Sequence, residues 1–187
     1  MKVGLIGNGG REHAIARGLC QHSDVSLYTT ASSNNPGIQE LSKDYYLVNM
    51  DDLQSVKTYF EQQAVELVIV GPEKPLIAGI VDLIRESGIP IVGPTQSQAR
   101  LEGDKSFMRK LLRDKVGWGS PNWQVVTSLS QAKQFIERVK AIVVKPLGLT
   151  GGKGVRVAGT QLEDQEETST YIQSLLESDG AVLLEEQ

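Results

Sequence analysis

The chain has few of the residues from which disulfide frameworks and metal sites are built. Its 187 residues include one cysteine, Cys20, and two histidines, His13 and His22. A single cysteine excludes a disulfide framework and a zinc site made of cysteines. Two histidines are too few for most metal sites built on histidine. The chemistry of this protein must therefore rest on other residue types.

The sequence also lacks an excess of positive charge and any long apolar run. It has 19 Lys and Arg residues against 23 Asp and Glu, a net charge of −4, so nothing favours a nucleic-acid backbone as partner. The apolar start ends at Gly7, which is too short for a signal peptide, and no small-residue cleavage site follows. No stretch approaches the ~18–20 apolar residues of a membrane span. We expect a cytoplasmic protein with no nucleic-acid or membrane partner.

What the first half does contain is an alternation of apolar runs and helix-period segments. Helices are expected at residues 11–21, 51–60 (capped by Asp51) and 76–86, and strands at 3–6, 25–29, 45–48, 67–70 and 89–92. Strands that are apolar throughout are typical of a parallel sheet covered by helices on both faces. The sequence therefore predicts an α/β, Rossmann-like domain over residues 1–100.

The pattern changes after Pro94. A helix at 104–113 and a Gly/Pro-rich connection at 117–121 predict a connecting helix and linker over residues 101–120. Strands at 122–126, 141–145, 155–158 and 181–185, with helices at 128–139 and 162–176, give a β-α-β-β-α-β order and predict a smaller α+β unit over 121–187. Because the chain stops after its last strand, we expect an exposed apolar edge at 181–184, with weak stability or self-association.

The first glycine-rich loop, Gly7-Asn8-Gly9-Gly10, links the first expected strand to the first helix. Glycines there let the backbone approach a ligand, and the helix N-terminus offers free N–H groups to an anion. The dinucleotide fingerprint fails, because Glu12 occupies the third glycine position and no acidic residue ends the second strand. On spacing alone, a tight turn and an anion site are equally supported.

The second glycine-rich loop, residues 148–154, holds four glycines and Lys153 in seven residues. Its spacing is not that of a Walker loop, and a strand rather than a helix follows. The pattern is typical of a hairpin flap that closes over phosphates with its N–H groups and Lys153. An ordinary solvated hairpin is the alternative.

Other charged residues are informative only in combination. Lys105 follows Asp104, a plausible helix cap, and a cation in the first helical turn costs a few tenths of a kcal/mol that an anionic ligand could offset. Lys145 ends one expected strand, and Glu185 ends another, followed by Glu186. Such a carboxylate pair can hold ribose hydroxyls or a metal. Taken singly, each of these side chains is better explained as exposed to solvent.

Several segments in a fixed order change this interpretation. They are Gly7-Asn8-Gly9-Gly10-Arg11-Glu12-His13-Ala14, Val70-Gly71-Pro72-Glu73, Gly93-Pro94-Thr95, Leu101-Glu102-Gly103 with Lys105, Val144-Lys145, Gly152-Lys153-Gly154-Val155 and Leu184-Glu185-Glu186. Together they resemble the phosphoribosylamine–glycine ligases (glycinamide ribonucleotide synthetases) of the ATP-grasp superfamily. The resemblance covers essentially the whole chain. Members of that family continue well past this length, so we expect the N-terminal portion only, with an incomplete ATP-grasp clamp.

The resemblance implies ATP-dependent ligation of glycine to 5-phospho-β-D-ribosylamine, through a glycyl phosphate, in de novo purine biosynthesis. It implies ATP and Mg²⁺ (or Mn²⁺) as cofactors, with the metal ligands outside this chain and a missing C-terminal half as a partner. The ATP-binding residues it implies are Lys105, Lys145, Gly151, Gly152, Lys153, Gly154, Glu185 and Glu186. The substrate-binding residues it implies are Gly9, Gly10, Arg11, Pro72 and Glu73, and no catalytic residue is assigned.

One stretch departs from the family pattern. Common bacterial members have Ala-Asp-Gly-Leu-Ala-x-Gly after the second lysine, where this chain has Pro146-Leu147-Gly148-Leu149-Thr150-Gly151 and so lacks that aspartate. Two other functions stay open. One is another ATP-grasp carboxylate–amine ligase, and the other is a non-catalytic nucleotide-binding module. We expect the 187-residue chain not to turn over on its own.

Overall fold

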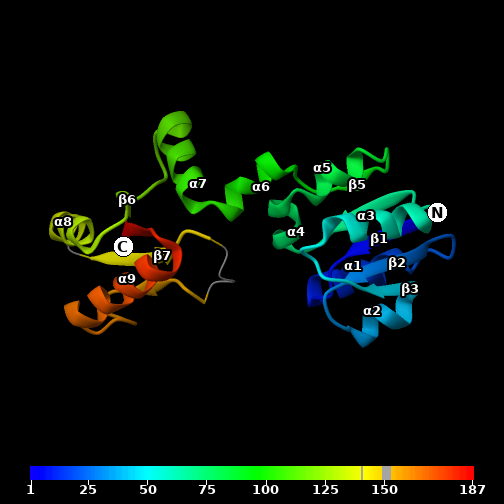
Figure 1. Cartoon of the computed structure of the whole chain (residues 1–187), viewed down its shortest axis with the longest axis horizontal. Helices are drawn as coiled ribbons and strands as arrows, with labels where there is room; N and C mark the ends of the chain where they lie inside the picture. The colour runs from blue at the N-terminus through cyan, green and yellow to red at the C-terminus, as the bar shows by residue number, and fades with distance from the viewer. Residues whose placement is uncertain (140, 149–152) are drawn as a thin grey trace. The chain divides into compact units, whose positions relative to one another are not determined.

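The computed structural model describes residues 1–139, 141–148 and 153–187. The chain divides into two units, Met1–Ala99 and Arg100–Gln187 (Figure 1). Within the described ranges, no helix is both long enough and apolar enough to cross a membrane.

The first unit is built on a five-stranded parallel sheet. Its strands are β1 (Lys2–Ile6), β2 (Ser26–Ala31), β3 (Ser42–Leu47), β4 (Leu67–Val70) and β5 (Ile91–Val92), in the order β3-β2-β1-β4-β5. Its helices are α1 (Gly10–Leu19), α2 (Pro36–Leu41), α3 (Leu53–Gln62), α4 (Glu73–Ala78) and α5 (Ile80–Arg85). The predicted parallel α/β architecture is confirmed.

Helices cover this sheet on both faces. Neighbouring residues of β1 belong to different core clusters, Leu5 to one and Ile6 to the other, as expected when successive side chains of a strand point to opposite faces. Phe60 of α3 is fully buried in the cluster that contains Ile6. Its ring lies against the bare backbone of Gly4, where an added Cβ would be 2.8 Å from the ring. The continuous apolar strands are thus explained by burial from two sides.

Two local predictions in the first unit were wrong, and one helix was missed. The single helix expected at 76–86 is two short helices, because Gly79 between them adopts a left-handed φ of 96° that interrupts the helix. The cap of α3 is Asp52 rather than Asp51, and its side chain accepts a hydrogen bond from the Ser55 amide at 3.1 Å. Helix α2 was missed, although Asn35 as cap followed by Pro36 at the first position is a common helix start.

The second unit contains a four-stranded antiparallel sheet. Helix α6 (Gln96–Gly103) crosses the boundary between the units and is followed by α7 (Lys105–Leu111) and a π-helical turn (Leu112–Val116). The strands β6 (Trp123–Val126), β7 (Ile142–Pro146), β8 (Arg156–Val157) and β9 (Val182–Glu186) alternate with α8 (Leu129–Val139) and α9 (Gln165–Asp179). The sheet order is β6-β9-β7-β8, and the predicted β-α-β-β-α-β succession is confirmed.

The last strand is central in its sheet, so the predicted apolar edge at 181–184 was wrong. β9 pairs with β6 on one side and β7 on the other. Val182, Leu183 and Leu184 are each 0% exposed. The expectation failed because the order of strands along a chain does not give their order in a sheet. Self-association through this strand therefore loses its basis.

The two faces of this second sheet differ in chemistry. Val144, Val182 and Leu184 join side chains of α8 and α9 in one apolar cluster. Side chains alternate along a strand, so Lys145 of β7 and Glu185 of β9 lie on the opposite face. The paired register of β7 and β9, with Lys145 opposite Leu183 and Val143 opposite Glu185, makes the two charged residues diagonal neighbours.

Candidate functional site

In the first unit, the predicted substrate residues gather at the carboxyl ends of β1 and β4. These strands are adjacent in the sheet. The chain runs outward from β1 to β2 and β3 on one side and to β4 and β5 on the other. In doubly wound sheets, ligands bind outside the carboxyl ends at this point of reversal. Gly9 and Gly10 follow β1, and Pro72 and Glu73 follow β4, so both predicted segments flank the reversal point.

Glu12 fills the space between these two turns. Glu12 is 4% exposed, and its Oε2 accepts a hydrogen bond from the Gly9 amide at 2.6 Å. A Cβ added at Gly71 would lie 2.2 Å from Oε1 of Glu12, and one at Gly7 would lie 2.7 Å from its Cγ. The residue that breaks the dinucleotide fingerprint therefore packs directly against the backbone of both turns.

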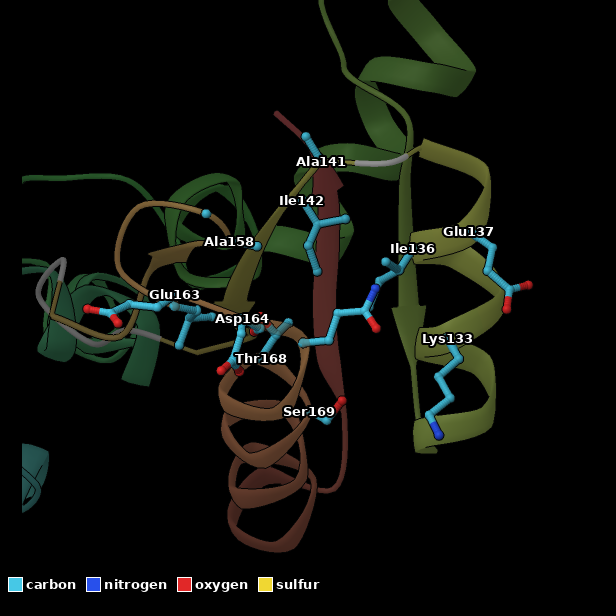
Figure 2. A pocket seen from close by; sticks show the side chains of 13 residues that line it. Lys133, Ile136, Glu137, Ala141, Ile142, Ala158, Glu163, Asp164, Thr168 and Ser169 are labelled. Carbon is cyan, nitrogen blue, oxygen red and sulfur yellow. Dashed lines mark hydrogen bonds between the residues drawn. The ribbon is translucent and has the colours of Figure 1, made fainter.

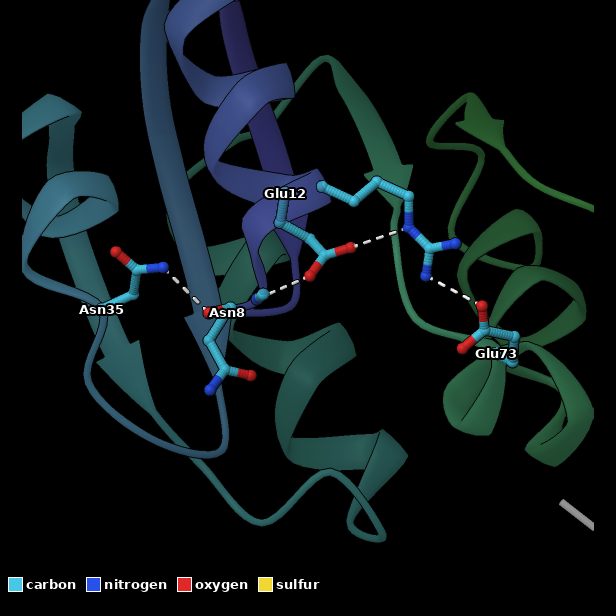
Figure 3. A network of polar contacts seen from close by, with 6 residues as sticks. Asn8, Glu12, Asn35 and Glu73 are labelled. Atoms are coloured by element: carbon cyan, nitrogen blue, oxygen red, sulfur yellow. Dashed lines mark hydrogen bonds and ion pairs between the residues drawn. The ribbon is translucent and has the colours of Figure 1, made fainter. Parts of the chain in front are cut away.

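Arg11 joins the two segments electrostatically. Its Nη2 donates to Oε1 of Glu73 at 2.9 Å, and its Nε donates to Oε1 of Glu12 at 3.2 Å (Figure 3). The pKa of Glu73 is lowered by its own backbone N–H and then by Arg11. Pro72 completes the junction, since a Cβ at Gly7 would be 2.8 Å from its Cδ. The structure thus brings Gly9, Arg11, Pro72 and Glu73 together, with Gly10 opening α1.

One residue near this junction, Asn35, was missed from the sequence. The side-chain amide of Asn35 donates to the carbonyl of Asn8 at 2.9 Å, which holds the loop after β2 against the first glycine loop (Figure 3). The helix-start pattern of Asn35-Pro36 was the available signal. His13 packs its ring against Gly37, where a Cβ would be 2.3 Å from the ring. This contact gives His13 a packing role.

In the second unit, Glu185 is the centre of a buried ion cluster. Arg109 of α7 holds it with two hydrogen bonds, Nε to Oε1 at 2.6 Å and Nη2 to Oε2 at 2.7 Å. The ammonium of Lys145 donates to the same Oε2. The side chains of Arg109, Glu185 and Lys145 are 13%, 4% and 21% exposed. Glu185 and Lys145 are therefore not the solvent-exposed side chains that the sequence favoured for each alone.

Lys105 belongs to the same electrostatic environment. It is half-buried at the first position of α7, and its Nζ donates to the carbonyl of Gly148 at 2.6 Å. Burial lowers the pKa of Lys105, and the positive charge of Lys145 lowers it further. Burial opposes ionisation of Glu185, but the hydrogen bonds from Arg109 and Lys145 outweigh it and lower its pKa. Three cations around one carboxylate leave an excess of positive charge.

The other predicted ATP-binding residues that the structure describes take no part in the hydrogen bonds of this cluster. Glu186 accepts a hydrogen bond from the side chain of Asn122 at 2.6 Å. Lys153 is exposed, and the Gly154 carbonyl accepts from the hydroxyl of Tyr171 at 2.7 Å. Gly151 and Gly152 lie outside the described residues.

Arg109 was missed from the sequence. Its partner Glu185 is 76 positions away, so no local pattern joins the two. The available signal was the spacing of four residues between Lys105 and Arg109, which puts both on one face of a helix.

A cavity of about 610 Å³ lies on the other, helical side of this sheet (Figure 2). The cavity is lined by Ile142 and Ala158 on the side of the sheet, by Lys133 of α8 and by Thr168 of α9. None of the predicted ATP-binding residues that the structure describes lines this cavity. In the part of the chain that the structure describes, no three His, Cys, Asp or Glu side chains group as metal ligands.

Family models account for both halves of the sequence. Residues 1–102 match the model described as "Phosphoribosylglycinamide synthetase, N domain". Residues 103–187 match "Phosphoribosylglycinamide synthetase, ATP-grasp (A) domain". The chain belongs to the phosphoribosylglycinamide synthetase family. The predicted family is thereby confirmed.

Similar family members are longer than this chain. The phosphoribosylamine–glycine ligase of Thermococcus gammatolerans is 43% identical over 188 residues, which cover 100% of this chain and 43% of the relative. That of Methanosarcina barkeri is also 43% identical, with the same coverage. The chain thus spans less than half the length of these relatives and matches their N-terminal portion.

Solved structures share the fold. The phosphoribosylamine–glycine ligase of Thermotoga maritima superposes with a TM-score of 0.73 at 22% identity, covering 100% of this chain and 44% of that one. The biotin carboxylase domain of a Hydrogenobacter thermophilus 2-oxoglutarate carboxylase, solved with MgADP and bicarbonate, gives 0.75 at 17% identity, with 98% and 43% covered. These similarities show the fold, and the family model for residues 103–187 names it an ATP-grasp domain.

Proposed function

We propose that this chain is the N-terminal part of a phosphoribosylamine–glycine ligase and contributes residues to two of its ligand sites. The reaction joins glycine to 5-phospho-β-D-ribosylamine and converts ATP to ADP and phosphate. The observation that carries the proposal is that two models of one family, in succession, account for residues 1–187. Identity of 43% to phosphoribosylamine–glycine ligases along the whole chain supports it.

The ATP phosphates are proposed to meet Lys105 and Lys145. An excess of positive charge in a half-buried setting favours a polyanion, because weak solvent screening strengthens the attraction. The loop that contains Gly151, Gly152, Lys153 and Gly154 is proposed to cover the phosphates, and Glu185 and Glu186 to lie at the nucleoside end. The cluster of Lys105, Lys145, Arg109 and Glu185 supports the first of these assignments.

The sugar phosphate is proposed to bind at the carboxyl ends of β1 and β4. Gly9, Gly10 and Arg11 would face it from one side, and Pro72 and Glu73 from the other. The N-terminus of α1, a ten-residue helix, favours an anion there. Arg11 is 57% exposed at its side chain, so its guanidinium reaches solvent beyond its two carboxylate partners.

The chemistry requires no protein nucleophile. The glycine carboxylate attacks the γ-phosphorus of ATP, ADP leaves, and the amine of the ribosylamine then displaces phosphate from the glycyl phosphate. The residues of this chain would supply positioning and neutralise phosphate charge. Mg²⁺ would add charge neutralisation, but the described residues do not group as its ligands, so no step is assigned to it.

A non-catalytic nucleotide-binding module is the second candidate. It stays open because the ligase activity is named for relatives that are more than twice as long as this chain. Another ATP-grasp carboxylate–amine ligase is disfavoured, because both family models name phosphoribosylglycinamide synthetase.

The deciding experiment measures ADP release with ATP, Mg²⁺, glycine and phosphoribosylamine, omitting each in turn. We expect ATP binding without turnover by the 187-residue chain. Turnover that needs both glycine and the ribosylamine would establish the ligase and overturn the expectation that more of the protein is required. ADP release that is independent of glycine would contradict the ligase assignment.

The ATP site is tested by calorimetric binding of MgATP to variants. Lys105→Ala and Lys145→Ala should each weaken binding about tenfold, as expected for loss of one charge-assisted contact. Lys133→Ala is the matched control, because this exposed lysine lies on α8, on the helical side of the sheet. Equal weakening by all three variants would show only general electrostatic attraction and would contradict the assigned site.

A further inference from the structure

We propose that Arg109 is a positioning residue, which fixes the ammonium of Lys145 by orienting the carboxylate of Glu185. The inference deepens the proposed ATP site, and its functional meaning rests on Lys145 meeting phosphate there. Nothing in the family comparison assigns a role to Arg109. Three side chains from three elements, α7, β7 and β9, meet in this cluster.

The first step is the geometry of the Arg109–Glu185 pair. Two parallel hydrogen bonds, at 2.6 and 2.7 Å, join the guanidinium fork to both carboxylate oxygens. Such bidentate pairing fixes the plane of a carboxylate as well as its position, which a lysine in the same place could not do. The carboxylate of Glu185 is thereby held from α7 rather than by its own strand alone.

Oε2 of Glu185 is shared between two cations. This oxygen accepts from Nη2 of Arg109 and from Nζ of Lys145. Once Arg109 orients the carboxylate, Oε2 defines where the Lys145 ammonium rests. Lysine otherwise has a flexible four-carbon stem with several rotamers, so the contact selects one position among many.

The Glu185 carboxylate is buried. Glu185 is 4% exposed at its side chain, so its negative charge has little water to stabilise it and depends on its two cations. Three of its roughly four acceptor positions are taken, two by Arg109 and one by Lys145. We therefore assign Glu185 as the internal counter-ion of the lysine cluster rather than as an acceptor for ribose hydroxyls.

The fourth step concerns the two lysines. The charge of Lys145 lowers the pKa of Lys105, whereas the charge of Glu185 raises it, so each is within electrostatic reach of Lys105. A correctly held Glu185 therefore limits the repulsion between the two ammonium groups while no phosphate is bound. Arg109 maintains that arrangement without contacting the phosphates.

The first test needs no nucleotide. Acetylation of individual lysines is followed by mass spectrometry, because an ammonium held in a largely buried ion pair is shielded from the reagent and reacts slowly. Arg109→Lys keeps the charge but removes the bidentate fork, and it should raise the rate at Lys145 about tenfold, the factor that corresponds to a loss of about 1.4 kcal/mol. The rate at exposed Lys133 should stay unchanged, and Glu185→Asp should reproduce the effect at Lys145.

The matched control is Arg113→Lys, since Arg113 is exposed and pairs with its neighbour Asp114. It should leave the rate at Lys145 as in the parent chain. An unchanged rate at Lys145 in both Arg109→Lys and Glu185→Asp would overturn the proposal. Faster acetylation of both Lys133 and Lys145 in Arg109→Lys would reveal general unfolding of that variant. Glu185→Asp would then decide: if it is folded by circular dichroism and Lys145 reacts as in the parent chain, the proposal is overturned.

The second test separates the counter-ion from a ribose ligand. Binding of MgATP and of the magnesium complex of 2′-deoxy-ATP is compared in the parent chain and in Glu185→Gln. A counter-ion role predicts the same loss, about tenfold, for both nucleotides. A loss confined to MgATP would show a ribose contact and overturn our assignment of Glu185. If the parent chain bound neither nucleotide, the proposed ATP site would fail, while the acetylation result would still decide the role of Arg109.

Discussion

Single residues in this chain carry charges in places where water cannot stabilise them. Glu185 is 3% exposed and depends on hydrogen bonds from Arg109 and Lys145. Glu12 is 4% exposed and is stabilised by the Gly9 amide and by Arg11. In both cases the carboxylate organises the backbone or side chains that surround it. The hydrogen bonds of Glu185 and Glu12 therefore contribute both to the stability of their units and to the arrangement of the candidate sites.

The lowered pKa of Glu185 predicts a loss of stability in acid. As pH falls, the unfolded chain takes up a proton at the ordinary glutamate pKa, ~4.3, before the folded chain does. The stabilisation is therefore complete above that value and is lost as pH falls through the lower, folded pKa. Urea unfolding of the second unit should show a falling free energy of unfolding below about pH 5. Glu185→Gln should flatten that fall, and an unchanged slope in this variant would contradict the pairing.

The backbone of Gly71 lies close to the side chain of Glu12, and this contact can be tested by substitution. An alanine there would place its Cβ 2.2 Å from Oε1 of Glu12, so the ion-paired carboxylate must move. Gly71→Ala should lower the free energy of unfolding by about 2 kcal/mol. In Gly18→Ala, the control, the new methyl meets nothing within 4 Å, and the helix should gain about 0.5 kcal/mol. Chemical denaturation measures both, and equal effects would argue against a packed Glu12.

Individual helices and strands show where local rules suffice. Asp104 caps α7 as expected, accepting from the Phe107 amide at 2.9 Å. The start of α3 shows the limit of such rules, since two aspartates in succession compete for one cap and only the geometry selects Asp52. Likewise, the apolar run of β9 identifies a strand but not its neighbours. Element type is a local property, whereas pairing is not.

The competing caps of α3 give a prediction for this element. Asp52→Ala should lower the urea midpoint of the first unit, because the amide of Ser55 loses its side-chain acceptor. Asp51→Ala should change it far less, because Asp51 forms only an exposed ion pair with Lys74 at 2.7 Å. A larger effect from Asp51→Ala would restore the cap that the sequence favoured.

At the scale of the whole chain, each unit is described with apolar clusters of its own. Among the described residues, the clusters around Phe60 and Leu5 consist of residues of the first unit, and the cluster around Phe135 consists of residues of the second. Each unit thus has an apolar core of its own, which the two successive family matches also suggest.

Separate cores predict separate responses to core truncation. Phe60→Ala should destabilise the first unit by about 3–5 kcal/mol, and Phe135→Ala should do the same to the second. Amide hydrogen exchange, read by peptide, locates the loss of protection. We expect it within residues 1–99 for Phe60→Ala and within 100–187 for Phe135→Ala. Loss of protection throughout the chain in either variant would contradict separate cores.

The sequence by itself determined the parallel sheet, the β-α-β-β-α-β succession, the position of both glycine-rich loops and the family. These features depend on periodicity, turn residues and short motifs, each confined to a few neighbouring positions. Only the tertiary structure decided that Arg109 meets Glu185, that Glu12 fills the space beside Gly71, and that β9 is an interior strand of its sheet. Those contacts join residues far apart in the chain, and their free energy depends on burial that exists only once the surrounding elements have packed.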